Sequence, residues 1–270
     1  MRRALTPGGE SSLAGVSFLA KVRSESAAFI LTGPMNVIVI IPAAGLGTRM
    51  APAGGRPQTS KQYSELGGVP ILLHTLRKFA ATPQVSEIYL ALRQAEAKPF
   101  LERMEADKLA KPVHVVEGGE NRQQSVTNAL DAVQANDDDI ILVHDAVRPL
   151  VDQETITHVI EAVMKYGAAI AAIPAVDTIK QVERTAEGAV VHATIPRAQI
   201  VMAQTPQGFR YDVIRKAVDD ASSDGFTGTD EASLIERGGG AVFVVMGSPK
   251  NIKITTPADM ELAEFYARKD

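Results

Sequence analysis

The first chemical feature of the sequence is a glycine-containing loop that follows an apolar run at residues 37–41. Gly45 and Gly47 lie in this loop, and the cations Arg49 and Lys61 follow it. Small residues let a polyphosphate approach the backbone, whose successive N–H groups can hold its oxygens. Arginine offers a planar fork and lysine a point charge. The pattern as a whole indicates phosphoryl or nucleotidyl transfer. Taken singly, the glycine pair is weak evidence and could be a tight turn, and each cation is better interpreted as a surface charge.

Two common nucleotide-binding fingerprints do not fit this loop. The dinucleotide fingerprint requires a third glycine three residues after the second, and Met50 occupies that position. The Walker loop requires Gly-Lys followed by Ser or Thr, and no such sequence is present in the loop. An NAD-dependent oxidoreductase is therefore disfavoured, and the loop is assigned to another class of nucleotide site.

The elements that must position these residues alternate between strand and helix patterns. The β-branched run at 37–41 is typical of a central parallel strand that is buried on both faces. Strands are expected at 37–41, 88–92, 113–116, 140–144 and 168–173, and helices at 71–79, 100–109, 123–133 and 155–164. This alternation predicts βαβ units in a Rossmann-like α/β fold, with a mostly parallel sheet flanked by helices.

The alternation of strand and helix patterns is interrupted at residues 177–197. Two extended segments, 178–183 and 189–194, enclose a turn-rich stretch at 184–188, which predicts an inserted β-hairpin arm. Such an arm is either a surface excursion or a dimer contact. The α/β pattern resumes at 211–219, 231–236, 242–246 and 258–266.

Composition excludes several other classes of protein. The chain has 270 residues, 45% hydrophobic and 22% charged, which predicts one large α/β domain. The formal net charge of −4 gives no general attraction for nucleic acid, so no nucleic-acid partner is expected. The sequence contains no cysteine, which excludes disulfides and thiolate chemistry and fits a cytoplasmic protein. No apolar run is long enough to span a membrane, so no membrane partner is expected.

The first 34 residues differ in composition from the rest, with an excess of basic over acidic residues and many Ser, Gly and Ala residues. A signal or transit peptide is one alternative. Because Met35 is followed at once by the strand pattern at 37–41, residues 1–34 are instead predicted to be a disordered leader or a misread start. The folded domain is assigned to residues 35–270.

A series of short motifs follows the glycine loop. The motifs are Lys61-Gln62-Tyr63, Gly118-Gly119-Glu120-Asn121-Arg122 with Ser125, His144-Asp145-Ala146-Val147-Arg148-Pro149, Asp177-Thr178, Arg197, Thr205-Pro206-Gln207, Thr229-Asp230-Glu231-Ala232 and Asn251-Ile252-Lys253. In this order the series resembles the 2-C-methyl-D-erythritol 4-phosphate cytidylyltransferase family of the non-mevalonate isoprenoid pathway. The resemblance covers nearly all of residues 37–266, and several independent motifs at compatible spacing leave little room for a chance match.

The resemblance implies an enzyme that transfers CMP from CTP to 2-C-methyl-D-erythritol 4-phosphate and releases pyrophosphate. The nearest alternative is a ribitol-5-phosphate (pentitol phosphate) cytidylyltransferase, which shares the loop, the Asp-Ala-x-Arg-Pro stretch and Asn-Ile-Lys. The sequences at 42–45 and 229–233 favour the methylerythritol enzyme. A non-catalytic nucleotide-binding protein is disfavoured because the sequence retains the whole set Arg49, Lys61, Asp145 and Lys253.

The same resemblance implies a role for each matching residue. The nucleotide-binding positions are Ala43, Ala44, Gly45, Gly47, Gly119, Glu120, Ser125, Asp145 and Ala146. The catalytic positions are Arg49, Lys61, Arg197 and Lys253, and the positions that bind the second substrate are Arg148, Thr178, Thr205 and Thr229. Asp145 is implied to lie beside a Mg²⁺ cofactor and the ribose. The family is a homodimer through its arm, so Arg197 is expected to complete the site of the partner.

The sequence departs from the family pattern near its catalytic lysine. The loop between Arg49 and Lys61 is longer than usual, and Ser60 stands where the family usually has proline. Glu120 replaces a frequent aspartate. These departures affect the conformation of the loop and thus the reach of Lys61.

Several motif residues also have ordinary structural alternatives. Asp145 and Arg148 could form a plain ion pair, and Asn121 could cap a helix. Ser125 could bond a backbone carbonyl, and the stretch 205–207 could be a simple turn. His144 is interpreted as a packed strand residue. The series as a whole, rather than any one residue, favours the catalytic interpretation.

Overall fold

Residues 35–45 and 60–268 are described by a computed structural model of the chain. The leader predicted at residues 1–34 lies outside the described residues, as do Gly47 and Arg49. Their predicted roles therefore stay predictions.

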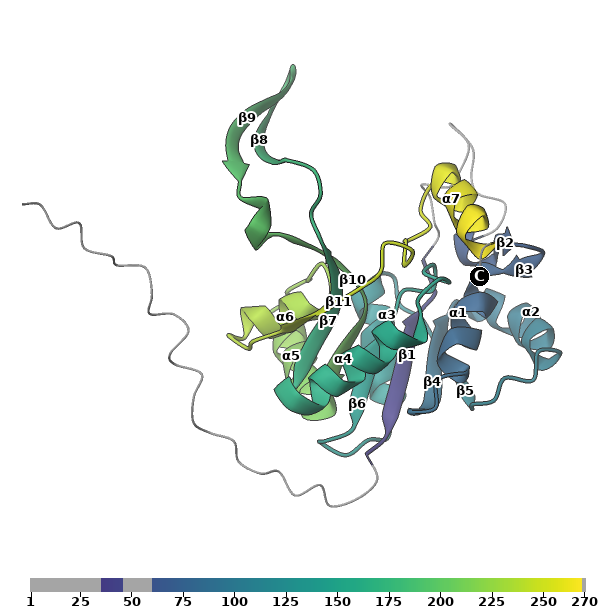
Figure 1. The fold of residues 1–270 in the computed structure, drawn as a ribbon. Helices are drawn as coiled ribbons and strands as arrows, with labels where there is room; N and C mark the ends of the chain where they lie inside the picture. Colours follow the sequence, from purple (N-terminus) through teal and green to yellow (C-terminus); the bar gives the residue numbers. More distant parts are fainter. Residues whose placement is uncertain (1–34, 46–59, 269–270) are drawn as a thin grey trace, which may run out of the picture. The chain divides into compact units, whose positions relative to one another are not determined.

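Strands and helices alternate along the domain as the sequence pattern predicts (Figure 1). The strands are β1 (Val37–Pro42), β2 (Glu65–Leu66), β3 (Val69–Pro70), β4 (Val85–Leu92), β5 (Val113–Glu117), β6 (Ile140–Val143), β7 (Ala168–Pro174), β8 (Ile179–Thr185), β9 (Gly188–Ile195), β10 (Val201–Arg210) and β11 (Phe243–Met246). The helices are α1 (Ile71–Ala80), α2 (Gln94–Glu105), α3 (Arg122–Ala132), α4 (Gln153–Tyr166), α5 (Tyr211–Ser223), α6 (Glu231–Arg237) and α7 (Pro257–Ala267), with 3-10 turns η2 (Lys61–Tyr63) and η3 (Arg197–Gln199).

The central sheet has seven strands in the order β11-β7-β10-β6-β1-β4-β5. Strand β1 pairs in parallel with both β4 and β6, whereas β10 is antiparallel to both of its neighbours. The chain runs from β1 outward to β4 and β5, then returns to place β6 on the other side of β1. Ligands of open α/β sheets bind at such a reversal, beyond the carboxyl ends of the strands. The fold therefore places its binding crevice at the ends of β1 and β6.

Helices cover both faces of the sheet (Figure 1). Both faces need cover because the apolar side chains of β1 point alternately to one face and to the other. Val39 and Ile41 belong to the core beneath α1, α2 and α4, and Ile38 and Ile40 belong to the core beneath α3, α5 and α6. All four are at most 1% exposed. Complete burial of such a side chain stabilises a protein by roughly 1.5–3 kcal/mol, so β1 is a firm support for the loop that follows it.

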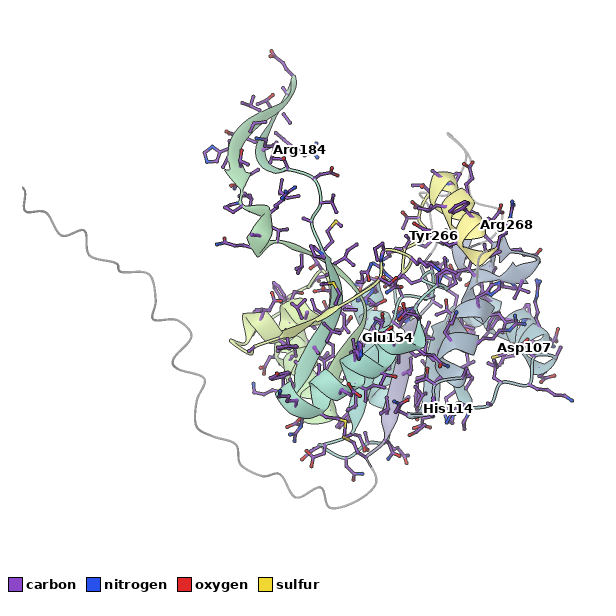
Figure 2. The ribbon with its side chains drawn as sticks, in the orientation of Figure 1. Asp107, His114, Glu154, Arg184, Tyr266 and Arg268 are labelled. Carbon is purple, nitrogen blue, oxygen red and sulfur yellow. The ribbon has the colours of Figure 1, made fainter. Side chains whose placement is uncertain are left out.

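The predicted arm is present as a two-stranded sheet of β8 and β9, which pair only with each other (Figure 1). Its turn is shorter than predicted, with Ala186 and Glu187 between the paired residues Thr185 and Gly188. Most side chains of the arm are exposed, including Arg184 in Figure 2. The expectation of an inserted hairpin is thus confirmed.

Two of the longer elements differ from the sequence prediction. No strand was expected at 201–210, and the alternative of a turn at 205–207 is wrong, because these residues lie within the buried strand β10. The β10–β7 register shifts between Ala203 and Gln207, which accommodates the missing N–H of Pro206. The helix predicted at 100–109 instead spans Gln94–Glu105 and carries Pro99 in its second turn.

Candidate active site

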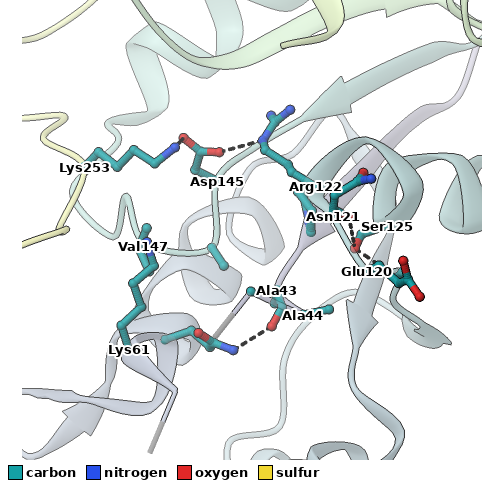
Figure 3. A pocket seen from close by; sticks show the side chains of 15 residues that line it. Ala43, Ala44, Lys61, Glu120, Asn121, Arg122, Ser125, Asp145, Val147 and Lys253 are labelled. Carbon is teal, nitrogen blue, oxygen red and sulfur yellow. Dashed lines mark hydrogen bonds and ion pairs between the residues drawn. The ribbon is translucent and has the colours of Figure 1, made fainter. Parts of the chain in front are cut away.

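Loops from the carboxyl ends of β1, β5 and β6 meet at one pocket (Figure 3). The end of β4 ties two of these loops together, since Ala43 N–H donates to Ala91 O (2.8 Å) and Gly118 N–H donates to Leu92 O (2.7 Å). A Cβ on Gly118 would lie 2.3 Å from the Cβ of Ala44, so only glycine allows this approach. Close packing of the two loops thus sets the floor of the pocket.

The pocket brings together ten of the residues predicted from the sequence. They are Ala43, Ala44, Gly45, Lys61, Gly119, Glu120, Ser125, Asp145, Ala146 and Lys253. Five further residues line it without having been assigned a role from the sequence, namely Pro42, Gln62, Asn121, Arg122 and Val147. Residues as far apart in the sequence as Pro42 and Lys253 therefore share one cavity.

Side chains of α3 fix the loop that precedes this helix. The Ser125 hydroxyl donates to Asn121 O (2.9 Å) and accepts from Gly119 N–H (3.0 Å). Asn121 caps the helix by accepting from Gln124 N–H (2.8 Å), as its structural alternative predicted. Because the hydroxyl hydrogen of Ser125 is already donated, Ser125 can offer a ligand only an acceptor lone pair.

Asp145 lies at the centre of a cluster of cations. Its Oδ1 is 3.1 Å from Arg122 Nε, and its Oδ2 is 3.2 Å from Arg148 Nε and 2.9 Å from Lys253 Nζ. Burial alone would raise the pKa of the Asp145 carboxyl, but the charges of Arg122, Lys253 and Arg148 outweigh it and hold the pKa well below its usual range. Asp145 is therefore ionised and orders three cations at the pocket.

Arg122 connects this cluster to a second buried carboxylate. Its Nη1 donates to both oxygens of Glu231, at 2.7 and 2.8 Å, and Glu231 is 2% exposed. Glu231 begins α6, whose N-cap Asp230 accepts from Gln207 Nε2 (2.7 Å). Arg122 thus joins α3, the loop after β6 and α6 in one network.

His144 and Thr205 hold the loop after β6 from behind. His144 Nε2 contacts Arg148 O (3.1 Å), which can only accept, so the ring proton lies on Nε2. Burial lowers the pKa of His144 to about 4, which leaves the ring neutral, and its Nδ1 accepts from the Thr205 hydroxyl (3.0 Å). Thr205 Oγ1 in turn accepts from Asp145 N–H (3.1 Å). His144 is therefore a packed residue that orients the loop, as interpreted from the sequence.

Other predicted residues are not brought to the pocket wall of this chain. Thr178 and Arg197 are exposed on the arm, where Arg197 Nη1 donates to Val176 O (2.8 Å). Thr229 is exposed just before α6. Arg148 and Thr205 lie behind the pocket and reach it through their contacts with Asp145.

Arg122 and Gln62 are two of the pocket residues that the sequence motifs include but to which no role was assigned. Gln62 is 2% exposed, and its Nε2 donates to Ala43 O (2.6 Å) at the end of β1. Both residues lie in recognised motifs, which is the one signal that could have singled them out. Their partners are distant in sequence, so no local pattern reveals the contacts.

The described cluster is suited to polyanions. Lys61, Arg122 and Lys253 line the pocket together with a floor of small residues whose backbone a phosphate can approach closely. A crevice of this kind at the switch point of a doubly wound sheet defines a nucleotide-binding α/β protein.

The particular family follows from comparison with known proteins. Residues 37–269 match the family model described as 2-C-methyl-D-erythritol 4-phosphate cytidylyltransferase, and the chain belongs to this family of nucleotidyltransferases. The family predicted from the motif series is confirmed.

Relatives and solved structures agree. The chain is 57% identical to the 2-C-methyl-D-erythritol 4-phosphate cytidylyltransferase of Acidobacterium capsulatum, over 87% of this chain and 98% of the relative. It is 48% identical to that of Solibacter usitatus, over 87% of this chain and 97% of the relative. The crystal structure of the Francisella tularensis enzyme matches with a TM-score of 0.71 and 38% identity, covering 85% of this chain and 99% of that one.

The described residues lack a membrane-spanning helix and a cluster of metal ligands. Within 35–45 and 60–268, no helix combines the length and apolar character needed to cross a bilayer. The same residues contain no group of three or more His, Cys, Asp and Glu side chains arranged to hold a metal ion.

Proposed function

We propose that this enzyme transfers CMP from CTP to 2-C-methyl-D-erythritol 4-phosphate, giving 4-diphosphocytidyl-2-C-methyl-D-erythritol and pyrophosphate in non-mevalonate isoprenoid biosynthesis. Membership of the family supports this reaction. The structural observation that carries it is the convergence of Lys61 and Lys253, from opposite ends of the chain, on one switch-point pocket beside Asp145. Two anionic substrates need cations between them to overcome their Coulomb repulsion.

The proposed chemistry requires no general base. The phosphate monoester of the polyol is mostly dianionic near neutral pH. One of its oxygens attacks the α-phosphorus of CTP in line, a new P–O bond forms, and the bond to the bridging oxygen breaks as pyrophosphate leaves. Arg49 and Lys61 stabilise the charge on the α-phosphate and the departing group. Lys253, and Arg197 of a partner, position the attacking phosphate.

The other substrate-binding roles follow the same proposal. Ala43, Ala44, Gly45 and Gly47 bind the triphosphate, and Gly119, Glu120, Ser125, Asp145 and Ala146 bind the cytidine. Arg148, Thr178, Thr205 and Thr229 bind or orient the polyol phosphate. The buried contacts of Thr205 and Arg148 with Asp145 indicate that these two act from behind the pocket wall.

A Mg²⁺ cofactor fits the proposed site through one carboxylate. Mg²⁺ is commonly held by one or two carboxylates together with substrate phosphates, and Asp145 supplies the hard oxygen donor. Both Asp145 oxygens contact cationic side chains, so we expect it to contribute at most one oxygen while the nucleotide phosphates supply the other ligands. When bound, Mg²⁺ neutralises charge on the phosphates.

A homodimer is proposed from the arm. An isolated two-stranded sheet is marginal in water. Val182, Val190 and Val191 of the arm are 44%, 61% and 56% exposed, and a symmetric partner would cover them. We further propose a cytoplasmic location, for which the cysteine-free sequence is the support.

The test measures pyrophosphate release with each pairing of CTP or ATP and each polyol phosphate. We expect turnover with CTP and 2-C-methyl-D-erythritol 4-phosphate, and loss of that turnover in Lys61→Ala. Equal rates with ATP would contradict the cytidine assignment at Gly119 and Ser125. Faster turnover with ribitol 5-phosphate would instead favour the pentitol alternative, which shares most of the motifs.

A further inference from the structure

The turn that presents Lys61 to the pocket has little structure of its own. The 3-10 turn η2 is three residues long and closes with bonds from Tyr63 N–H to Ser60 O (2.9 Å) and from Ser64 N–H to Lys61 O (3.1 Å). So short a turn has too few backbone bonds to be rigid alone. Contacts with other elements must therefore determine where Lys61 lies.

The carboxylate of Glu96, at the start of α2, accepts hydrogen bonds from hydroxyl groups on either side of Lys61. The Ser60 hydroxyl donates to Glu96 Oε1 (2.5 Å), and the Tyr63 hydroxyl donates to Glu96 Oε2 (3.4 Å). Ser60 is only 7% exposed, so its bond to Glu96 is sheltered from water. Hydrogen bonds to an ionised acceptor are roughly twice as strong as neutral ones. Glu96 thus clamps the residue before Lys61 and, more loosely, the second residue after it.

The same end of α2 also holds the backbone that leaves β1, at the start of the glycine loop. Arg93, the N-cap residue, donates from Nε to Ala44 O (2.6 Å), and Glu96 N–H donates to Arg93 O (2.9 Å). One turn later, Phe100 packs its ring 5.6 Å from that of Tyr63. Helix α2 is therefore a common support for the lysine turn and for the backbone that follows β1.

We propose that Glu96 is a positioning residue that, through Ser60 and Tyr63, sets the placement of Lys61 relative to the backbone at Ala44. The proposal rests on the proposed function of Lys61 in stabilising charge on CTP. Misplacement of a catalytic group by about 1 Å can lower a rate by roughly 100-fold, so loss of the clamp should reduce kcat more than it changes the KM for CTP.

The test compares Glu96→Ala with Glu102→Ala, the same substitution at an exposed position of the same helix. We expect Glu96→Ala to lower kcat by roughly tenfold with a KM for CTP within about threefold of wild type, and Glu102→Ala to change neither. Wild-type kcat in Glu96→Ala would overturn the proposal. If Glu96→Ala does not fold, the double variant Ser60→Ala/Tyr63→Phe removes both donors and is judged by the same criterion.

A double-mutant cycle separates this proposal from the function on which it rests. If Glu96 acts through Lys61, Glu96→Ala adds little to the loss already caused by Lys61→Ala, whereas independent effects would multiply. Multiplied losses would overturn the positioning role. If Lys61→Ala itself keeps wild-type kcat, the proposed function of Lys61 and the positioning role both fail. If Lys61→Ala is slow and Glu96→Ala is not, only the positioning role fails.

Recovery of kcat by a second substitution provides a further readout, because a general loss of stability in Glu96→Ala would not be corrected at Ser60. Ser60 has a φ of −64°, which is the value that a proline ring imposes. Ser60→Pro should therefore hold the turn without a hydroxyl, and should recover at least part of the kcat lost in Glu96→Ala. A Ser60→Pro/Glu96→Ala variant no faster than Glu96→Ala would show that rigidity of this turn is not what Glu96 supplies.

Discussion

The link between Arg122 and Glu231 yields a prediction about the stability of the folded protein and its dependence on pH. The perturbation is Arg122→Met, which keeps a long apolar stem and removes the guanidinium. Glu231, at 2% exposed, would lose both of its hydrogen bonds to Arg122 Nη1. Asp145 would keep Arg148 and Lys253 as partners, so the penalty should come mainly from Glu231.

The magnitude follows from the cost of an uncompensated buried charge. Removing one partner of a buried ion pair destabilises proteins by about 3–5 kcal/mol, a large fraction of a typical total of roughly 5–15 kcal/mol. Burial raises the pKa of Glu231, and Arg122 opposes this rise in the wild type. Because the pKa of Glu231 is raised, its charged form disfavours folding. The stability that Arg122→Met loses relative to the wild type should therefore shrink as the pH falls from 7 toward 5.

The assay is equilibrium unfolding in urea at pH 7 and pH 5. The double variant Arg122→Met/Glu231→Gln, which removes the buried charge, should recover part of the lost stability at pH 7. Lys216→Met removes an exposed pair with Asp220 and should cost at most about 1 kcal/mol. An Arg122→Met protein as stable as the wild type, or a deficit that does not depend on pH, would refute the reasoning.

Two further predictions concern the arm and the leader. Arg197→Ala should weaken use of the polyol phosphate far more than CTP binding. Mixing Arg197→Ala with Lys61→Ala should restore activity on subunit exchange, because a mixed dimer has one site with neither defect. If exchange is demonstrated and no activity returns, the arm serves its own chain. A chain that begins at Met35 should fold and turn over normally, since the motifs all follow Met35, and circular dichroism with a turnover assay would expose a leader that is required.

Local patterns account for most of the elements that were predicted correctly. The β-branched run of β1 and the apolar periodicity of α1 and α4 are short-range signals that the structure retains. Strand β10 was missed because Pro206 interrupts a strand pattern, and only pairing with β6 and β7 on both sides holds that segment in the sheet. The start of α2 was missed because Pro99 lies inside the helix, in its second turn, where proline removes a backbone hydrogen bond and is normally unfavourable.

In the site, too, some residues could be found from the sequence and others only from the structure. The glycine loop, Lys61, Asp145 and Lys253 could be singled out because each belongs to a motif of recognisable order. The bonds of Arg122 to Glu231, 109 residues away, and of Ser60 to Glu96, 36 residues away, join side chains whose neighbours in sequence carry no sign of the contact. Pairings of this kind depend on which helix covers which strand.

The sequence alone therefore determined the alternating α/β architecture, the arm and the family, because periodicity, turn residues and ordered motifs are properties of short segments. The tertiary structure decided that β6 returns beside β1, that three cations converge on Asp145 and that α2 supports the turn of Lys61. These facts result from burial of both faces of one sheet, which brings distant segments together and leaves their polar groups to find partners there.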